Sequence, residues 1–144
     1  MAIEKSLYTA RATTTGGRRN GKSSSSDGQL LVKLNAPKEL GGSGDGTNPE
    51  QLFAAGYSAC FLGAMQAMAK PMGLTLSPQA KVTAEVDFGP LAEGVKGYGI
   101  AVSMQIEVPD LEREQAEALV AAAHEICPYS NATRNNVDVT LTVA

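Results

Sequence analysis

The chain has 144 residues, a length typical of one compact domain, so we expect a single domain spanning residues 1–144. Its composition, 43% hydrophobic and 19% charged, provides material for a core and argues against a disordered chain. The net charge of −3 disfavours general binding of polyanions, and no nucleic-acid partner is expected. No apolar run approaches the roughly 20 residues of a membrane span, and residues 1–8 lack the apolar segment of a signal peptide. We therefore expect a soluble, cytoplasmic protein with no membrane partner.

The first third of the chain predicts two strands and two loops. Residues 6–15 alternate and are rich in threonine, which predicts a strand. Residues 16–28 contain no apolar side chain and are predicted to form a turn or loop, followed by a short strand over 29–34. Residues 35–46 contain Pro37 and four glycines, which indicates a second loop long enough to have a function.

A long apolar helix is predicted next. The segment TNPE at residues 47–50 favours a helix start, because it offers capping residues, a proline for the first helical position and an acid at the positive end of the dipole. The helix is expected to run from about Pro49 to Lys70, before the helix breakers Pro71 and Gly73. It is apolar nearly all round, which indicates a helix buried in the core.

The remaining chain predicts a hairpin, a second helix and a last strand. Residues 81–88 and 98–108 alternate and are joined by a glycine-rich turn. An amphipathic helix is expected from Leu111 to about Ile126, ended by Pro128, and residues 137–143 alternate to the C-terminus. The order β-β-α-β-β-α-β predicts an α+β domain with mostly antiparallel pairing.

The two cysteines are the strongest candidates for chemistry. Cys60 lies in the middle of the first helix, where the dipole gives little help and burial raises a thiol pKa, so a reactive thiolate needs a cation from elsewhere. Cys127 lies at the C-terminal end of the second helix, where the dipole disfavours a thiolate. If the pair is a redox couple, this asymmetry favours Cys60 as the attacking thiol and Cys127 as the resolving thiol. The alternative is that Cys60 is a small core side chain without chemistry.

Candidate cations lie in the polar segment 16–28, which contains Arg18, Arg19 and Lys22. An arginine folded over Cys60 would lower the pKa of the thiol and hold a carboxylate with its other edge. Glu50 could be that carboxylate, or it could simply be an acid at a helix start. The alternative for the cations is a solvated hairpin tip.

Other sites have weaker support. His124 lies three residues before Cys127, so a Cys–His dyad is conceivable, although a histidine near a helix C-terminus is more often simply favourable there. One histidine and two distant cysteines do not provide the ligands of a structural zinc site, so no metal is expected. The segment GGSGDG at residues 41–46 lacks the lysine of a phosphate-binding loop and is interpreted as a flexible loop.

Two long segments resemble a known family. TNPEQLFAAGYSACFLGAM (residues 47–65) and CPYSNATRNNVDVTL (residues 127–141) are similar to the signature blocks of organic hydroperoxide resistance proteins, in the superfamily of the osmotically inducible protein C. LYTARATTTGGR and LGGSGDGTNPEQ also fit, so the resemblance covers essentially the whole chain. It implies an intertwined homodimer with antiparallel sheets wrapped around long, buried central helices that carry the reactive cysteine, and with active sites at the subunit interface.

The resemblance also implies an activity and assigns residues to it. It implies a thiol-dependent peroxidase that reduces alkyl and fatty acid hydroperoxides to alcohols, with Cys60 as the peroxidatic cysteine and Cys127 as the resolving one. Arg18 matches the arginine of the GGR motif, and Glu50 matches the acid that orients it. Family members often read GGRDG where this chain has a second arginine, Arg19, so the choice of Arg18 rests on its position after the glycine pair. The reductant implied is a lipoylated protein or dihydrolipoamide, so no bound cofactor is required.

The mechanism expected from these assignments has three steps. The Cys60 thiolate attacks the distal peroxide oxygen, the sulfenic acid condenses with Cys127, and an external dithiol reopens the disulfide. Two alternatives remain: a peroxidase of the osmotically inducible branch with a different peroxide preference, and a non-enzymatic dimer that binds small molecules or lipids. A redox sensor is disfavoured by the acidic pI and the lack of a helix-turn-helix pattern.

Overall fold

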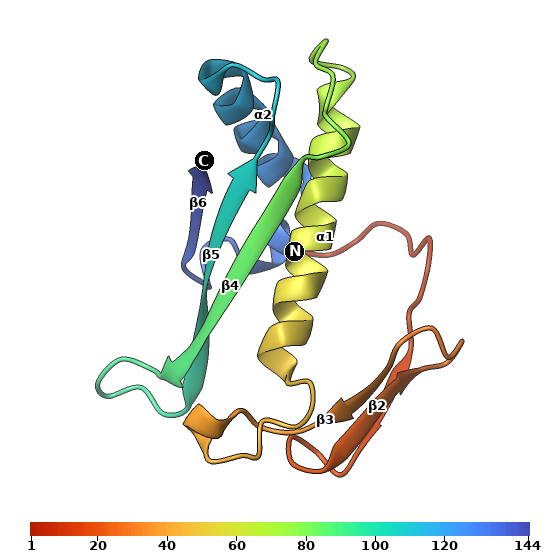
Figure 1. Ribbon diagram of the computed structural model, residues 1–144, viewed down its shortest axis with the longest axis vertical. Coiled ribbons are helices and arrows are strands. Elements are labelled where there is room, and N and C mark those ends of the chain that lie inside the picture. Colours follow the sequence, from red (N-terminus) through yellow and green to blue (C-terminus); the bar gives the residue numbers. More distant parts are fainter. The chain divides into compact units, whose positions relative to one another are not determined.

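The computed structural model describes all 144 residues, and it divides into two compact units, Met1–Leu52 and Phe53–Ala144 (Figure 1). The division falls within the first turn of the long helix α1 (Pro49–Ala69). Each unit contains one three-stranded sheet, so strands and helices are mixed in the α+β class predicted from the sequence.

The first unit is built on an antiparallel sheet in the order β1-β2-β3. Its strands are β1 (Ala12–Thr15), β2 (Gly21–Ser25) and β3 (Leu31–Leu34). A short 3-10 helix, η1 (Lys38–Leu40), lies in the segment predicted as the second loop.

The prediction that residues 16–28 form only a loop is wrong, because β2 lies inside that segment. The strand contains no apolar side chain, so the alternation of apolar and polar residues that usually predicts a strand is missing. Backbone pairing with both neighbours forms it instead, supported by a 2.9 Å hydrogen bond from the hydroxyl of Thr14 to that of Ser23. The strand predicted over 6–15 is also shorter than expected and begins only at Ala12, where pairing with β2 begins.

The start of α1 agrees with the sequence. The side-chain oxygen of Asn48 accepts a hydrogen bond from the backbone N–H of Gln51 at 2.9 Å. The side-chain oxygen of Gln51 accepts one in return from the backbone N–H of Asn48 at 3.3 Å. This reciprocal pair satisfies two backbone donors at the helix start, as a capping box does.

The second unit is built on the sheet β4-β5-β6. The predicted hairpin is confirmed as β4 (Lys81–Pro90) paired antiparallel with β5 (Tyr98–Glu107). The last strand, β6 (Val139–Val143), pairs parallel with β5, because the chain crosses over through helices α2 (Arg113–Ile126) and α3 (Pro128–Thr133) before it returns to the sheet.

Two boundaries in this unit differ from the prediction. Helix α2 begins at Arg113 rather than Leu111, because Glu112 and Gln115 form a capping box at that point. Pro128 ends α2 as predicted, but it also begins α3, which the sequence analysis missed. Proline suits the first position of a helix as well as it blocks the continuation of the preceding one.

One face of the sheet β4-β5-β6 carries the core, against which α1 and α2 pack (Figure 1). The opposite face is exposed, as the alternation along β4 shows. The largest fully buried side chains of this core are Tyr57, Phe61, Met65, Met104, Ile106, Leu119 and Cys127.

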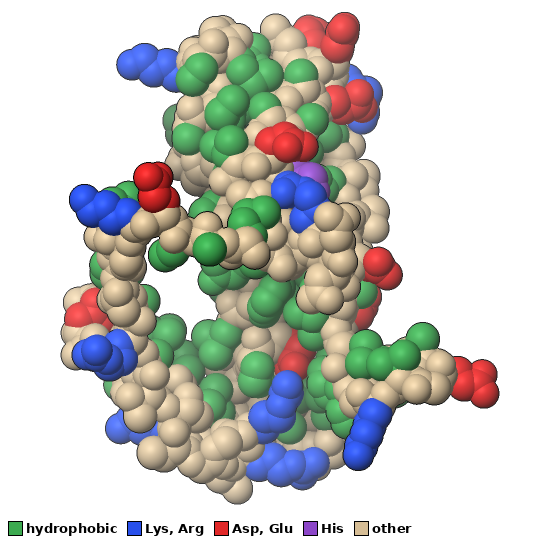
Figure 2. All heavy atoms as spheres, turned by 180° about the vertical axis from the view of Figure 1, so that it is seen from behind, with side chains coloured by type: hydrophobic (Ala, Val, Ile, Leu, Met, Phe, Trp, Pro, Cys, Tyr) green, Lys and Arg blue, Asp and Glu red, His purple; other side chains and the backbone are tan.

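Helix α1 is less buried than the sequence predicts. Tyr57, Phe61 and Met65 face the core, whereas Ala55, Ala59, Gly63 and Ala67 are exposed. By length and composition, α1 is also apolar enough to cross a membrane, with a mean hydropathy of 1.3, but core helices pass the same test. Figure 2 shows that hydrophobic side chains are exposed among polar ones on the face viewed from behind.

Candidate functional site

The fold brings the two cysteines together. Cys60 lies in the middle of α1, and Cys127 lies between α2 and α3. They are 67 residues apart in sequence, yet their sulfur atoms are 3.7 Å apart, with the Cys127 thiol placed to donate to Cys60. Both are free thiols, and because a disulfide needs about 2.05 Å between its sulfurs, a short displacement separates this arrangement from a bond.

The two thiols differ in accessibility. Cys60 is partly exposed, whereas Cys127 is fully buried, with 0% of its surface accessible. Of the two residues, Cys60 is therefore the one that an oxidant in solution can approach. This difference supports the order of reaction expected from the helix dipoles.

Within the second unit, the surroundings of Cys60 favour the neutral thiol. Burial raises the pKa of Cys60, and the nearby Cys127 thiol raises it further, while a hydrogen bond from the backbone N–H of Tyr129 lowers it. The net direction is upward. A reactive thiolate at Cys60 therefore needs a positive charge that these groups do not supply.

The first unit holds a paired arginine and glutamate. The guanidinium of Arg18 donates two hydrogen bonds to the carboxylate of Glu50, at 2.8 and 3.2 Å. Their mutual hydrogen bonding lowers the pKa of Glu50 and raises that of Arg18, so both stay charged. The two-point geometry fixes the plane of the guanidinium, which a single contact would leave free to rotate.

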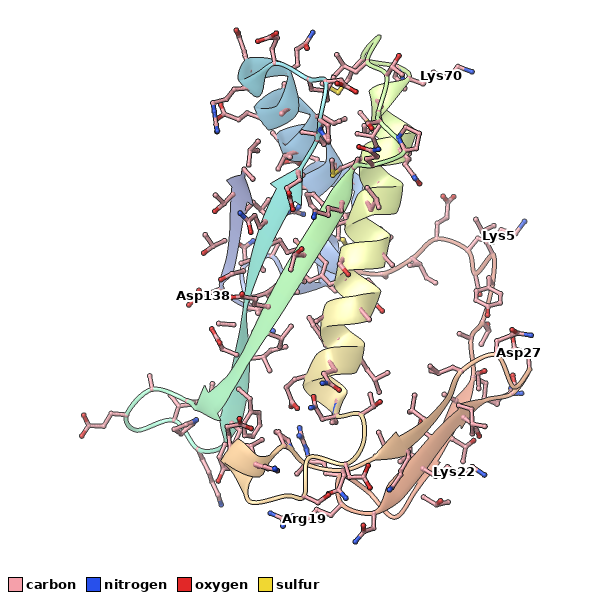
Figure 3. All side chains as sticks on the ribbon, viewed as in Figure 1. Lys5, Arg19, Lys22, Asp27, Lys70 and Asp138 are labelled. Carbon is pink, nitrogen blue, oxygen red and sulfur yellow. The ribbon has the colours of Figure 1, made fainter.

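The neighbouring cations have different surroundings. Arg19 donates to the backbone oxygens of Leu40 and Gly41, each at 3.0 Å, and so supports the loop that contains η1. Lys22 lies exposed on β2. Figure 3 labels Arg19 and Lys22, which both belong to the first unit. Of the three candidate cations, Arg18 is the one whose guanidinium is oriented by a carboxylate.

A buried cluster of polar side chains, which the sequence analysis did not identify, surrounds Ser130. The Ser130 hydroxyl lies 2.9 Å from the Tyr57 hydroxyl and 2.8 Å from Nδ1 of His124. The Tyr57 hydroxyl also lies 3.2 Å from that of Thr133. We call these four side chains the hydroxyl–imidazole cluster. The available signal was Tyr57, a polar side chain in the mainly apolar segment of α1.

His124 therefore bonds through its Nδ1 within this cluster, whereas the sequence left a dyad with Cys127 open. Burial lowers the pKa of His124, the charge of Arg134 lowers it further, and Glu125 opposes both. The neutral imidazole is thus favoured, which suits a ring nitrogen that shares one hydrogen bond with a hydroxyl.

Aromatic rings pack together on the segments that carry the two cysteines. Phe53 packs edge-on against Tyr57 and Tyr129, with ring centroids 6.1 and 6.0 Å apart. Gly56 allows this packing, because a Cβ atom at that position would lie 2.8 Å from the Tyr129 hydroxyl oxygen. The surroundings of Cys60 on α1 are therefore mainly apolar and aromatic.

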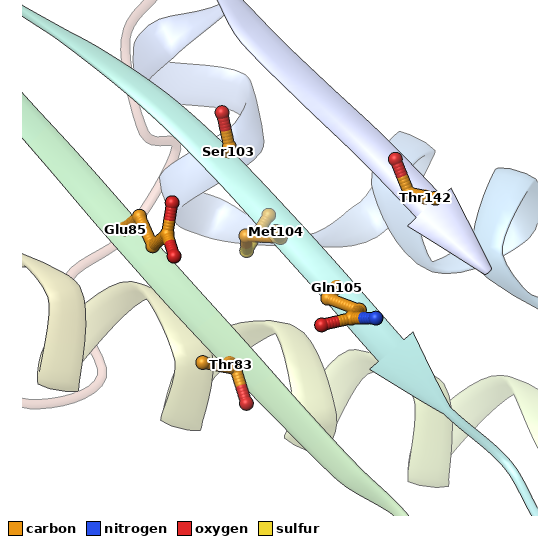
Figure 4. A pocket seen from close by; sticks show the side chains of 6 residues that line it. All are labelled: Thr83, Glu85, Ser103, Met104, Gln105 and Thr142. Carbon is orange, nitrogen blue, oxygen red and sulfur yellow. The ribbon is translucent and has the colours of Figure 1, made fainter. Parts of the chain in front are cut away.

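A separate hollow lies on the exposed face of the sheet β4-β5-β6 (Figure 4). Its volume is about 200 Å³, and it contains no cysteine, histidine or cation. The polar side chains that line it come from all three strands and are Thr83, Glu85, Ser103, Gln105 and Thr142. Elsewhere, no group of three or more histidine, cysteine or acidic side chains is arranged to hold a metal ion.

Comparison with known proteins identifies the family. The profile of the OsmC-like protein family matches residues 42–142. An organic hydroperoxide resistance protein of Xanthomonas axonopodis pv. citri is 54% identical over 142 residues, which cover 98% of this chain and 97% of the relative. The chain belongs to the organic hydroperoxide resistance proteins of the OsmC-like family.

Solved structures of this family agree with the fold. The crystal structure of an organic hydroperoxide resistance protein from Legionella pneumophila is 48% identical, covers 97% of this chain and 99% of its own, and has a TM-score of 0.90. That of OhrB from Bacillus subtilis is 43% identical, covers 96% and 100%, and has a TM-score of 0.85. The α+β fold predicted from the sequence is thus confirmed, and the family resemblance with it.

Proposed function

We propose that this protein is a thiol-dependent peroxidase that reduces organic hydroperoxides to alcohols, with Cys60 as the attacking thiol. The observation that carries the proposal is the 3.7 Å approach of Cys60 and Cys127 in a chain of the organic hydroperoxide resistance family. Cys60 is partly exposed and Cys127 is buried, which suits a reaction in which Cys60 meets the hydroperoxide and Cys127 reacts afterwards.

The proposed reaction has three steps. The Cys60 thiolate attacks the distal oxygen of the hydroperoxide, the O–O bond breaks, and the alcohol leaves once its oxygen has gained a proton. The resulting sulfenic acid then condenses with the Cys127 thiol, which forms the disulfide and releases water. An external dithiol reduces this disulfide to two thiols and is itself oxidised to a disulfide.

Arg18 supplies the positive charge that is absent from the groups acting on Cys60, and Glu50 orients it. In this proposal the guanidinium of Arg18 approaches Cys60 in the assembled homodimer, lowers the pKa of the thiol and stabilises the leaving oxygen. Glu50 holds the guanidinium in place through its two hydrogen bonds. The pair belongs to the first unit and the sulfurs to the second, so either the same chain or the partner chain can supply it.

The substrate is an alkyl or fatty acid hydroperoxide. The aromatic side chains Phe53 and Tyr129, on the segments that carry the two cysteines, support this preference over hydrogen peroxide, because part of the binding energy comes from burial of an alkyl chain. The reductant proposed is a lipoylated protein or dihydrolipoamide. We further propose one domain over residues 1–144, a homodimer and a cytoplasmic location.

Peptide mapping after one equivalent of tert-butyl hydroperoxide tests the proposal. The parental protein should yield a peptide pair joined through Cys60 and Cys127, and turnover with dihydrolipoamide should stop in the Cys60→Ser variant. If that variant consumes the hydroperoxide at the parental rate, the cysteines are inert and a non-enzymatic binding protein becomes the better interpretation. A higher activity on hydrogen peroxide than on tert-butyl hydroperoxide would contradict the substrate preference.

A further inference from the structure

The hydroxyl–imidazole cluster joins the three helices that surround the sulfur pair. Tyr57 lies on α1, three residues before Cys60. Ser130 lies in α3, three residues after Cys127, and His124 lies on α2, three residues before it. Each of these three side chains is thus about one helical turn, roughly 5 Å along an axis, from the cysteine of its own segment.

Burial makes the hydrogen bonds of this cluster costly to break. Tyr57 and Ser130 are fully buried, and Thr133 is nearly so. A buried hydroxyl that loses its partner cannot replace it with water, so the cluster resists any movement that separates its members. A shift of α3 away from α1 would separate Ser130 from Tyr57 and would separate the two sulfurs at the same time.

The donors and acceptors of the cluster form a consistent chain. The hydroxyl of Thr133 donates to the backbone oxygen of Ser130 at 3.2 Å, which leaves its oxygen free to accept from Tyr57. The Ser130 hydroxyl can then donate to Tyr57 and accept from Nδ1–H of His124. No buried side-chain nitrogen or oxygen is left without a partner, so the cluster is complete without a further ligand.

We infer that Tyr57 and Ser130 are positioning residues for the second chemical step, in which the Cys127 sulfur meets the Cys60 sulfur. Their hydrogen bond holds α3 against α1, keeps the sulfurs in contact and thereby raises the effective concentration of one thiol at the other. His124 fixes the Ser130 hydroxyl from the α2 side. The three side chains touch no substrate and act through the position of Cys127.

This inference rests on the proposed function, but one consequence can be tested without a hydroperoxide. In a buffer of reduced and oxidised glutathione, the two protein thiols transfer two electrons and two protons to oxidised glutathione, giving the internal disulfide and two reduced glutathione molecules. Trapping the remaining thiols and weighing the products by mass spectrometry gives the equilibrium constant, which measures the effective concentration of the pair. This measurement stands even if the protein reduces no hydroperoxide.

Two substitutions remove a hydroxyl from the cluster, and each has a matched control. Tyr57→Phe and Ser130→Ala should lower the effective concentration about tenfold, which corresponds to about 1.4 kcal/mol. Tyr98→Phe and Ser103→Ala remove the same groups from exposed positions on β5 and should leave it within about twofold, as surface changes usually do. The double variant of Tyr57 and Ser130 should lose little more than either single variant, because both remove the same contact.

A kinetic readout separates positioning from general loosening. With excess hydroperoxide, the rate at which Cys60 forms sulfenic acid should be unchanged in Tyr57→Phe, while disulfide formation slows and sulfinic acid accumulates at Cys60. An unchanged or higher effective concentration in both variants would overturn the inference, and so would equal slowing of the two steps. If Ser130→Ala does not fold, Tyr57→Phe decides alone, because it keeps the ring and its packing. If the parental protein forms no sulfenic acid, the proposed function fails while the glutathione equilibrium still judges the cluster.

Discussion

At the scale of single residues, adjacent arginines have different surroundings. Arg18 binds the carboxylate of Glu50 through two hydrogen bonds, whereas Arg19 binds backbone oxygens at residues 40 and 41. The sequence alone separated them only by their position after the glycine pair. The structure adds a physical distinction. Of the two arginines, Arg18 is the one bound to a carboxylate, that of Glu50, which raises the pKa of Arg18 and so favours its charged form.

Arg18→Ala should therefore slow the first oxidation step about 100-fold, the effect of removing one charge-stabilising donor, and shift its pH profile to higher pH. The shift is upward because burial already raises the pKa of Cys60, and loss of the cation leaves that rise uncompensated. Rapid-mixing measurement of sulfenic acid formation between pH 5 and pH 9 checks both effects. Arg19→Ala is the control, and equal losses in the two variants would refute the choice of Arg18.

Cys127→Ser should leave the first oxidation of Cys60 intact and block the second step. The sulfenic acid then lacks a thiol partner 3.7 Å away and is oxidised further during repeated exposure to hydroperoxide. Mass spectrometry should find sulfinic and sulfonic acid at Cys60 in the variant and a disulfide in the parental protein. Absence of overoxidised Cys60 in the variant would remove Cys127 from the mechanism.

At the scale of elements, local signals predicted some boundaries well and others poorly. The start of α1 was predictable, because its capping residues and proline lie next to each other in sequence. Strand β2 was not, because a serine-rich strand shows no apolar alternation and depends on its neighbours for pairing. The approach of Cys60 to Cys127 was not predictable from spacing either, since it depends on how α3 packs against α1.

The cap of α1 gives a prediction at this scale. Asn48→Ala removes the acceptor for the N–H of Gln51 and should destabilise the protein by about 1 kcal/mol, lowering the melting temperature by about 2–4 °C. Asn48→Asp keeps an acceptor at the same place and should stay near the parental value. Thermal unfolding followed by circular dichroism distinguishes them, and an unchanged midpoint for Asn48→Ala would mean that the cap contributes nothing.

At the scale of the whole molecule, one face of α1 is exposed and has no partner within the second unit. Ala55, Ala59, Gly63 and Ala67 are exposed along it, although the sequence predicted a buried helix. The sequence was informative about composition, but a single chain does not bury all the apolar surface that it carries. The homodimer proposed for the family's fold would cover this face with a second copy.

Ala59→Glu tests that arrangement. A glutamate on this face would place like charges near each other across a two-fold interface, so sedimentation velocity should show dissociation to monomers at concentrations where the parental protein is a dimer. Ala118→Glu makes the same substitution on an exposed position of α2 and should leave the dimer intact. A stable dimer in the Ala59→Glu variant would exclude α1 from the interface.

In the proposed reaction, the complete burial of Cys127 has a consequence for the reduction of the disulfide after each cycle. A bulky reductant approaching the oxidised protein meets only the outer sulfur of the pair, so it becomes covalently tethered through Cys60 while Cys127 departs inward. Trapped mixed disulfides between the protein and the reductant should therefore carry the reductant at Cys60 alone. The proposed reductant thus returns electrons to the same sulfur atom that reacts with the hydroperoxide.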